Sequence, residues 1–281
     1  MKFIISSNPD NLEDYLGKFA STATVEAEYG ERVVKGSKYT LAHHGPRSGE
    51  RCPCIYDNFN DEGIEVAGLS HFDLDSLGGC AAILGEKPFM NGFWDLAAFV
   101  DLNGFHRILE SGATKEDIDR LYAFSAWSKN NRINAPRDGS VDDITDYIMN
   151  AVEVLYRIRD NEESIINEGR SMRSKEYELN LNSFVEITPS GLIVRVSPEF
   201  CNFLYCSPDG TLGRAIVSYN PKSGTITLSV AAAESFSCCE IMQRLFGSLA
   251  GGHAGIAGSP RGNRMSLNDF NLTYNYVCGV M

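Results

Sequence analysis

The segment G63-IEVAGLSHFDLD-75 followed by S76-LGGCAAILG-85 decides the fold of this chain. Its first half is an apolar run that ends in a cluster of acids, and its second half is rich in small residues and predicts a helix opened by Ser76. A strand, a polar turn and a helix in this order are typical of an open α/β sheet, where ligands bind at the carboxyl edge of the strands. We therefore expect an α/β fold with a functional site near residues 70–76.

The flanking sequence extends this pattern. Short strands are predicted at 3–5, 24–29 and 37–44, and 93–106 repeats the scheme of a hydrophobic strand that ends in polar residues. Helices are predicted at 10–20 with Asp10 or Asn11 as cap, at 115–130 with Thr114 as cap, and as one or two helices over 141–172. The N-terminal part should be a mainly parallel sheet with flanking helices.

The composition changes near residues 173–182. Residues 183–200 and 215–230 are strand–turn–strand patterns, residues 234–249 form an amphipathic helical pattern, and 251–262 is a glycine-rich loop. We expect two domains, 1–176 and 177–281, the second a smaller mixed α/β domain, with an active-site cleft between them.

Net charge and composition narrow the classes of partner that this chain is expected to bind. The chain has 281 residues and a net charge of -12, which disfavours duplex nucleic acid because that partner binds best to a basic surface. It has no apolar run long enough for a membrane span and no signal-peptide pattern, so we expect a cytoplasmic protein without a membrane partner. The eight cysteines are interpreted mainly as small buried hydrophobes, although Cys52, Cys54 and a nearby histidine leave a zinc site open.

The strongest site signal is the cluster of His71, Asp73 and Asp75. Alternate residues of an extended chain point the same way, so these three groups can converge on a metal ion. Imidazole and carboxylate together suit Mn, Zn or Fe. A solvated acidic turn in which Ser76 caps a helix is the competing interpretation.

A second signal is Asp101, which ends the hydrophobic part of the stretch 93–106. Asn103 and His106 follow just beyond it. Asp101 could bridge two metals and His106 could complete the site. An ordinary Asn-Gly turn remains the alternative.

Further candidates lie elsewhere in the chain. His43 and His44 precede Arg47, which could hold a phosphate, and because adjacent residues of a strand face opposite ways we expect at most one histidine on a given metal. A surface loop is the alternative here. Asp143, beside Asp142 at the start of a predicted helix, either complements the helix dipole or binds metal.

The glycine-rich stretch 251–258 is the last candidate. Successive small residues expose backbone N–H groups that can bind an anion, although a glycine-rich helix cap is also consistent. We favour a phosphate-contacting role for Gly251, Gly252, His253, Gly255 and Arg261.

Two of these motifs together resemble the DHH phosphoesterase superfamily. SHFDLDSLGG (70–79) is similar to its first motif, and GGHAGIAG (251–258) to the glycine loop of the DHH-associated C-terminal domain. The resemblance covers roughly residues 60–262. An Asp-His-His triplet is absent, and Asp101 to His106 is the nearest stand-in. Residues 1–60 have no counterpart in the resemblance.

The resemblance implies a metal-dependent phosphohydrolase that cleaves a phosphodiester in a small nucleotide or short oligonucleotide, with phosphomonoester or polyphosphate hydrolysis as the nearest variant. It implies one or two divalent ions, Mn²⁺ first. The chain could also be a homodimer. The alternative is a non-catalytic nucleotide sensor that keeps the fold. The residues assigned by this interpretation are His71, Asp73, Asp75, Asp101, His43 and Asp143 for metal, His106 and His71 for catalysis, and Gly251, Gly252, His253, Gly255, Arg261, Arg47 and His44 for substrate.

Overall fold

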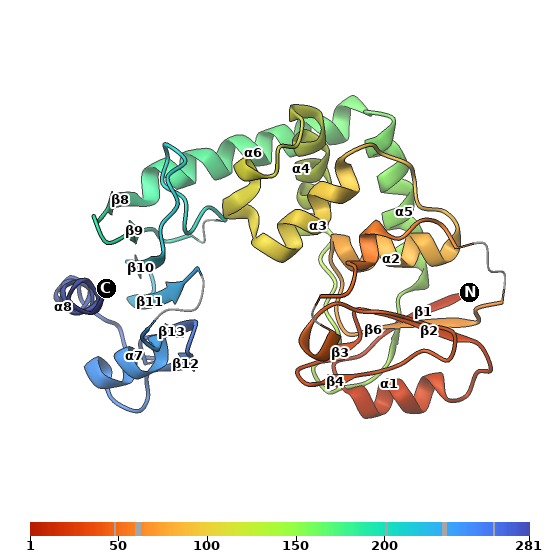
Figure 1. Cartoon of the computed structure of the whole chain (residues 1–281), viewed down its shortest axis with the longest axis horizontal. Helices are drawn as coiled ribbons and strands as arrows, with labels where there is room; N and C mark the ends of the chain where they lie inside the picture. The colour runs from red at the N-terminus through yellow and green to blue at the C-terminus, as the bar shows by residue number, and fades with distance from the viewer. Residues whose placement is uncertain (48, 60–62, 200–201, 232–234, 261) are drawn as a thin grey trace. The chain divides into compact units, whose positions relative to one another are not determined.

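The computed structural model describes residues 1–47, 49–59, 63–199, 202–231, 235–260 and 262–281 (Figure 1). The chain divides into two compact units. The N-terminal unit comprises residues 1–102 and 111–172, and the C-terminal unit comprises residues 103–110 and 173–281. The division lies four residues from the predicted boundary at 176, and the short segment 103–110 groups with the second unit. The cleft expected between the domains stays a prediction.

The N-terminal unit is built on a five-stranded sheet in the order β5-β2-β6-β1-β7. Its strands are β1 (Lys2–Ile5), β2 (Thr22–Val25), β5 (Tyr39–Leu41), β6 (Val66–Leu69) and β7 (Asp142–Asp143). The first four are mutually parallel and only β7 is antiparallel. Because parallel strands in register end together, the carboxyl ends of β5, β2 and β6 lie next to one another at one edge.

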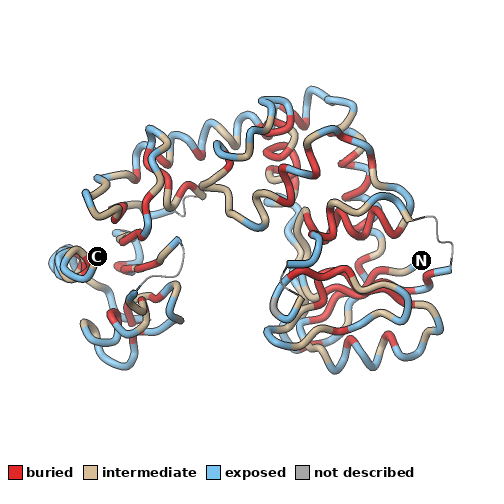
Figure 2. The backbone as a smooth tube through the Cα atoms, in the orientation of Figure 1, coloured by how far each residue is buried: buried red, intermediate tan, exposed pale blue. Residues whose placement is uncertain are grey.

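Helices cover both faces of this sheet. Figure 1 shows α1 (Pro9–Leu16) and α2 (Leu74–Leu84) on opposite sides, and Figure 2 shows the strands between them as buried. Helix α1 begins after Asn8, whose side chain caps it, and not after Asp10 or Asn11 as predicted. Strands β2 and β6 are buried along their whole length, which fits the small and apolar residues of β6 and the small and β-branched residues of β2.

The junction between β6 and α2 confirms the prediction from the deciding stretch, with one correction. Asp73, and not Ser76, is the N-cap of α2: its side chain accepts from the Ser76 N–H, and the Ser76 hydroxyl accepts from the Asp73 N–H. This reciprocal capping box fixes the Asp73 carboxylate at the start of the helix.

Two predicted elements are wrong. Residues 93–103, predicted as a strand, form α3 (Phe93–Asn103), in which Phe93, Leu96 and Ala97 lie on one buried face at helical spacing. A short apolar run is compatible with either structure, and here its length of about three turns and its packing decide for the helix. Asp142 and Asp143, predicted to open a helix, pair with β1 instead, and α5 (Thr145–Arg159) begins after them.

The remaining elements of this unit complete its helical layer and its connections. Helix α4 (Lys115–Asn130) begins at Thr114 as predicted. Helix α6 (Glu163–Ser183) follows α5, so the region 141–172 holds two helices. The connections contain β3 (Glu28–Tyr29), β4 (Arg32–Val33), the 3-10 turns η1 (Gly45–Arg47) and η2 (Pro53–Ile55), and in the other unit η3 (Phe105–Glu110). No helix in the described ranges combines the length and apolar character needed to span a bilayer.

The C-terminal unit contains a six-stranded mixed sheet in the order β12-β13-β11-β10-β9-β8. Its strands are β8 (Phe184–Ile187), β9 (Leu192–Val196), β10 (Ala215–Asn220), β11 (Thr225–Val230), β12 (Gly251–His253) and β13 (Ile256–Gly258). The apolar face of this sheet packs on α7 (Cys238–Phe246) and on α8 (Leu267–Val280), a helix that the sequence interpretation did not include. The described chain is thus a mixed α/β protein with a mostly parallel first sheet, as expected.

Candidate metal centre

Seven acidic and imidazole side chains gather at the carboxyl edge of the N-terminal sheet. Glu26 follows β2, the strand that lies between β5 and β6. The backbone of Glu26 has φ of 51°, an unusual value for a residue with a side chain. The members, which we call the carboxylate–imidazole cluster, are Glu26, His43, His44, His71, Asp73, Asp75 and Asp101.

The first half of the cluster surrounds His43. Its Nε2 lies 3.0 Å from Asp75 Oδ2, 3.2 Å from Asp101 Oδ2 and 3.3 Å from Glu26 Oε1. The side chains of His43 and Glu26 are fully buried, and that of Asp101 is 20% exposed. Three carboxylate oxygens therefore converge on one ring nitrogen, and all four of these atoms are buried.

The second half uses the other oxygen of Glu26. Glu26 Oε2 lies 3.3 Å from His44 Nε2 and 3.5 Å from His71 Nε2, and His71 Nε2 lies 3.2 Å from Asp73 Oδ2. His44 and His71 are each 46% exposed. The Glu26 carboxylate thus joins a buried group of side chains to a solvent-facing one.

The atoms that face one another contact members of the same cluster and have no hydrogen-bond partner elsewhere among the described residues. The buried atoms in this state include both Glu26 oxygens, His43 Nε2, Asp75 Oδ2 and Asp101 Oδ2. Five such atoms aimed at a common region fit divalent cations, which accept lone pairs from both carboxylate and imidazole.

The pKa values show how strongly this edge attracts positive charge. Burial on its own lowers the pKa of His43, but hydrogen bonds to Asp101 and Asp75 outweigh it and raise the pKa to about 12. Hydrogen bonds to Asp73 and Glu26 raise the pKa of His71 to about 10. Burial raises the pKa of the Glu26 carboxyl. In the metal-free protein, the protonated rings of His43 and His71 therefore offset part of the negative charge of the carboxylates.

Two expectations about this edge need correction. His43 and His44 both face Glu26, although we expected their side chains to face opposite ways; that at most one of them binds a given metal stays a prediction. The reason is that β5 ends at Leu41, so the two histidines lie beyond the strand and do not alternate; their ring centroids are 4.0 Å apart. Glu26 was missed altogether, although an acid in the otherwise apolar run 22–27 was a signal that could have identified it.

Cys52 and Cys54, the cysteines of the alternative zinc site, have thiols that contact different groups. Cys52 Sγ lies 3.6 Å from His43 Nδ1 and forms, with His43, Asp75 and Asp101, a group whose ligand atoms lie within 4.8 Å of one another. The Cys54 thiol instead contacts the carbonyl oxygen of Trp94 at 3.6 Å.

Three predicted residues lie outside the cluster. His106 belongs to η3 in the C-terminal unit, where its ring contacts Tyr205 and burial lowers its pKa. Asp143 pairs with Lys2 at 3.1 Å and bonds to Thr145. Arg47 forms an ion pair of 2.7 Å with Glu50.

The glycine-rich segment is ordered differently from the expectation. It forms a hairpin of β12 and β13 at the edge of the C-terminal sheet, and not an irregular loop. A Cβ on Gly252 would lie 2.2 Å from the Ile256 carbonyl oxygen, so the hairpin requires glycine there. Gly251 and Gly255 belong to the same hairpin. The side chain of His253 and all of Arg261 lie outside what the structure describes.

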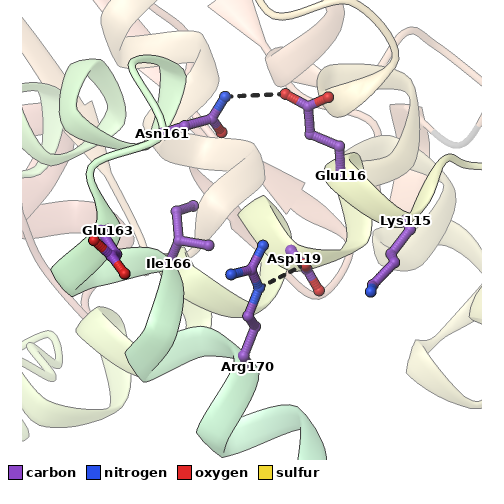
Figure 3. A pocket seen from close by; sticks show the side chains of 7 residues that line it. All are labelled: Lys115, Glu116, Asp119, Asn161, Glu163, Ile166 and Arg170. Carbon is purple, nitrogen blue, oxygen red and sulfur yellow. Dashed lines mark hydrogen bonds and ion pairs between the residues drawn. The ribbon is translucent and has the colours of Figure 1, made fainter.

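A separate hollow of about 620 Å³ lies in the N-terminal unit (Figure 3). Its polar groups pair with each other, as in the Arg170–Asp119 contact of 2.9 Å and the Asn161–Glu116 contact of 3.1 Å. No member of the carboxylate–imidazole cluster lines it. The lining residues are Lys115, Glu116, Asp119, Asn161, Glu163, Ile166 and Arg170.

Comparisons with known proteins give only distant likenesses. No protein-family model matches the chain, and no curated protein matches it. An exopolyphosphatase-related protein from Bacteroides fragilis is similar in structure with a TM-score of 0.32 and 10% identity, over 96% of this chain and 75% of that one. An uncharacterized protein from Helicobacter pylori G27 has a TM-score of 0.22 and 14% identity, over 98% and 97%. At these scores neither likeness identifies a family, so the functional argument rests on the cluster itself.

Proposed function

We propose that the carboxylate–imidazole cluster binds one or two divalent metal ions and that the protein is a metal-dependent phosphohydrolase. The observation that carries this proposal is the set of buried carboxylate and imidazole atoms of Glu26, His43, Asp75 and Asp101, in which three carboxylate oxygens lie 3.0, 3.2 and 3.3 Å from one ring nitrogen. Seven such groups at the carboxyl edge of a parallel sheet lie where open α/β proteins bind their ligands.

The arrangement supports two neighbouring metal positions. His43, Asp75 and Asp101 would hold one ion with Glu26 Oε1, and His71 and Asp73 would hold another with Glu26 Oε2. Mn²⁺ is the ion we test first, since mixed carboxylate and imidazole ligands suit it. When bound, such ions polarise phosphoryl oxygens and lower the pKa of water.

The residues around the cluster orient the ligands. The Ser70 hydroxyl contacts His71 Nδ1 at 2.9 Å, which leaves Nε2 to face Glu26. The Cys54 N–H donates to Asp75 Oδ1 at 2.8 Å, which leaves Oδ2 to face His43. His44, His71 and Asp73 are the most exposed members, so a substrate phosphate would approach from their side, and His44, which is not assigned to a metal, could give a proton to the leaving oxygen.

The substrate class rests on chemistry and on the motif resemblance. The Asp-x-Asp motif resembles that of phosphodiesterases acting on small nucleotides, and the net charge of -12 disfavours a long duplex. We propose a phosphodiester in a small nucleotide or short oligonucleotide, with inorganic polyphosphate as the nearest variant. The C-terminal hairpin with Gly251, Gly252 and Gly255 would contact that substrate.

The test is an assay of the purified chain with Mn²⁺, Mg²⁺ and Zn²⁺ against a linear dinucleotide, a cyclic dinucleotide, a generic phosphodiester and polyphosphate. We expect turnover that a chelator abolishes and that returning Mn²⁺ restores. Metal binding without turnover of any substrate would refute the hydrolase. In that case, tight binding of an unconsumed nucleotide would favour the sensor alternative.

A further inference from the structure

The buried half of the carboxylate–imidazole cluster has a sulfur atom beside it. Four donor atoms lie within 4.8 Å of one another: one ring nitrogen of His43, Cys52 Sγ and one oxygen each of Asp75 and Asp101. Donors around one tetrahedral ion lie roughly 3.3–3.6 Å apart, given metal–ligand lengths of about 2.0–2.3 Å. His43 Nε2 lies 3.0 Å and 3.2 Å from the two carboxylates, and Cys52 Sγ lies 3.6 Å from His43 Nδ1. The four side chains are therefore close enough to share one cation.

These donors are buried, and their polar atoms serve no other group. The side chains of His43 and Asp75 are 0% and 1% exposed, and Cys52 is a free cysteine that is 2% exposed. Among the described residues, His43 Nε2, Asp75 Oδ2 and Asp101 Oδ2 have no hydrogen-bond partner outside the cluster. A buried cysteine by itself would be a small hydrophobe, but this thiol lies beside three polar atoms that a cation would satisfy.

The segment Cys52–Cys54 is held close to α2, the helix that carries Asp75. The Cys54 N–H donates to Asp75 Oδ1 at 2.8 Å, which leaves Oδ2 to face His43. A Cβ on Gly78 would lie 2.5 Å from Cys54 Cβ, closer than real Cβ atoms approach. Glycine at this position of α2 therefore lets the segment approach the helix, and the same segment brings the Cys52 thiol to the Asp75 carboxylate.

The exposed half of the cluster offers a different set of donors. Glu26, His71 and Asp73 form a separate group of possible ligands that contains only carboxylate and imidazole. Carboxylate oxygens suit Mn²⁺ and Mg²⁺, whereas a thiolate selects softer ions, Zn²⁺ among them. The two halves of the cluster therefore differ in the ion that their donors favour.

We propose that Cys52 joins His43, Asp75 and Asp101 as a ligand of the buried metal position, and that this position takes Zn²⁺ in preference to Mn²⁺. The exposed half remains the position for Mn²⁺. The inference rests on the proposed metal centre but not on the identity of the substrate. Because the ligand is the thiolate, the S–H bond of Cys52 breaks as the sulfur–metal bond forms, and the proton passes to solvent.

The first test is titration of Co²⁺ into the full chain, followed by absorption, with a reductant that does not bind metal. A thiolate bound to Co²⁺ gives a strong sulfur-to-metal charge-transfer band, which carboxylate and imidazole do not give. We expect the band in the wild type and its loss in Cys52→Ser. A wild type that binds Co²⁺ without the band would overturn the inference.

Cys54→Ala is the matched control for this titration. It removes the neighbouring buried thiol, which contacts the carbonyl oxygen of Trp94, and keeps the backbone N–H that donates to Asp75. We expect Cys54→Ala to keep the band. A band that Cys54→Ala loses and Cys52→Ser keeps would overturn the inference, because the sulfur ligand would then be Cys54.

A second measurement needs no substitution and so does not depend on whether a variant folds. X-ray absorption of the wild type with one equivalent of Zn²⁺ should show one sulfur at about 2.3 Å beside oxygen and nitrogen at about 2.0–2.2 Å. A shell of oxygen and nitrogen alone would overturn the inference.

The preference for Zn²⁺ is tested by competition titrations of Zn²⁺ and Mn²⁺ with the wild type and Cys52→Ser. We expect the substitution to lower the Zn²⁺ affinity at least about 100-fold, since loss of a ligand should exceed the 10–100-fold cost of losing a partner behind one. The affinity of the exposed half for Mn²⁺ should stay as in the wild type. Equal losses for both ions would overturn the assigned preference.

The outcomes also separate this inference from the proposed function. Metal-dependent turnover by a chain whose bound metal has no sulfur ligand would overturn the role of Cys52 and leave the hydrolase intact. A sulfur-ligated ion in a chain that hydrolyses nothing would refute the hydrolase and leave the role of Cys52 intact. A wild type that binds no divalent ion would overturn both.

Discussion

Replacing Glu26 with Gln tests the cluster most directly. The side chain is fully buried and its two oxygens face the two halves of the cluster. Glu26→Gln keeps the shape and removes the charge. Burial raises the pKa of Glu26, so its ionised form is less favourable in the folded than in the unfolded metal-free protein. Above that pKa the metal-free variant should therefore be at least as stable as wild type, while its metal affinity falls.

The size of the effect follows from linkage. Partners behind a ligand are worth about 10–100-fold in affinity, so loss of a ligand that serves both positions should cost at least about 100-fold. Metal at 100 times its dissociation constant stabilises the wild type by about 2.7 kcal/mol, and the same concentration would stabilise the variant by about 0.4 kcal/mol. For a folded unit of this size, the metal-induced rise in Tm should fall from roughly 5–10 °C to about 1 °C.

The assay is thermal unfolding with and without Mn²⁺, supported by calorimetric titration. Glu65→Gln is a matched control, because Glu65 precedes β6 at the opposite edge of the same sheet, where it accepts from the N–H groups of Ala20 and Ser21. We expect the control to keep the full metal-induced shift. If Glu26→Gln kept that shift, the bridging role assigned to Glu26 would be refuted.

Three further predictions follow from the same geometry. Asp75→Asn keeps an oxygen for the Cys54 backbone N–H but removes the charge that faces His43. Mn²⁺-dependent turnover should therefore fall at least about 100-fold in a steady-state assay, and unchanged turnover would exclude Asp75 as a ligand. His43 and His71, with pKa values raised to about 12 and about 10, are protonated in the metal-free protein at neutral pH and must be neutral to bind metal. Metal affinity should therefore rise with pH, with about one proton released per histidine, as titrations in buffers of different ionisation enthalpy would measure; binding without proton release would contradict the assignment. Gly78→Ala places a Cβ 2.5 Å from Cys54 Cβ and should lower the free energy of unfolding, measured by urea denaturation, by about 1–3 kcal/mol. An unchanged free energy of unfolding would show that the backbone around Cys54 can move away.

The elements whose packing matches their local pattern were predictable. The β6–α2 junction, α4 with its Thr114 cap, and strands β8 to β11 of the C-terminal sheet follow from periodicity and turn residues. Residues 93–103 were not, because an eleven-residue apolar stretch fits either a buried strand or a buried helix until its neighbours are known. Asp142 and Asp143 look like a helix start, yet pairing with β1 recruits them into the sheet.

By itself the sequence determined that an α/β sheet carries His71, Asp73 and Asp75 at a strand-to-helix junction, since the apolar run and the helix start are local properties; the alternation expected for these three side chains does not apply, because Asp75 lies in α2. Only the tertiary structure decided which other groups meet that motif. Glu26 and His43 precede it by tens of residues and reach it because β2 lies beside β6 and β5 lies beside β2, while Asp101 reaches it from a helix. Strand order and helix packing depend on contacts between distant segments, and no local pattern encodes them.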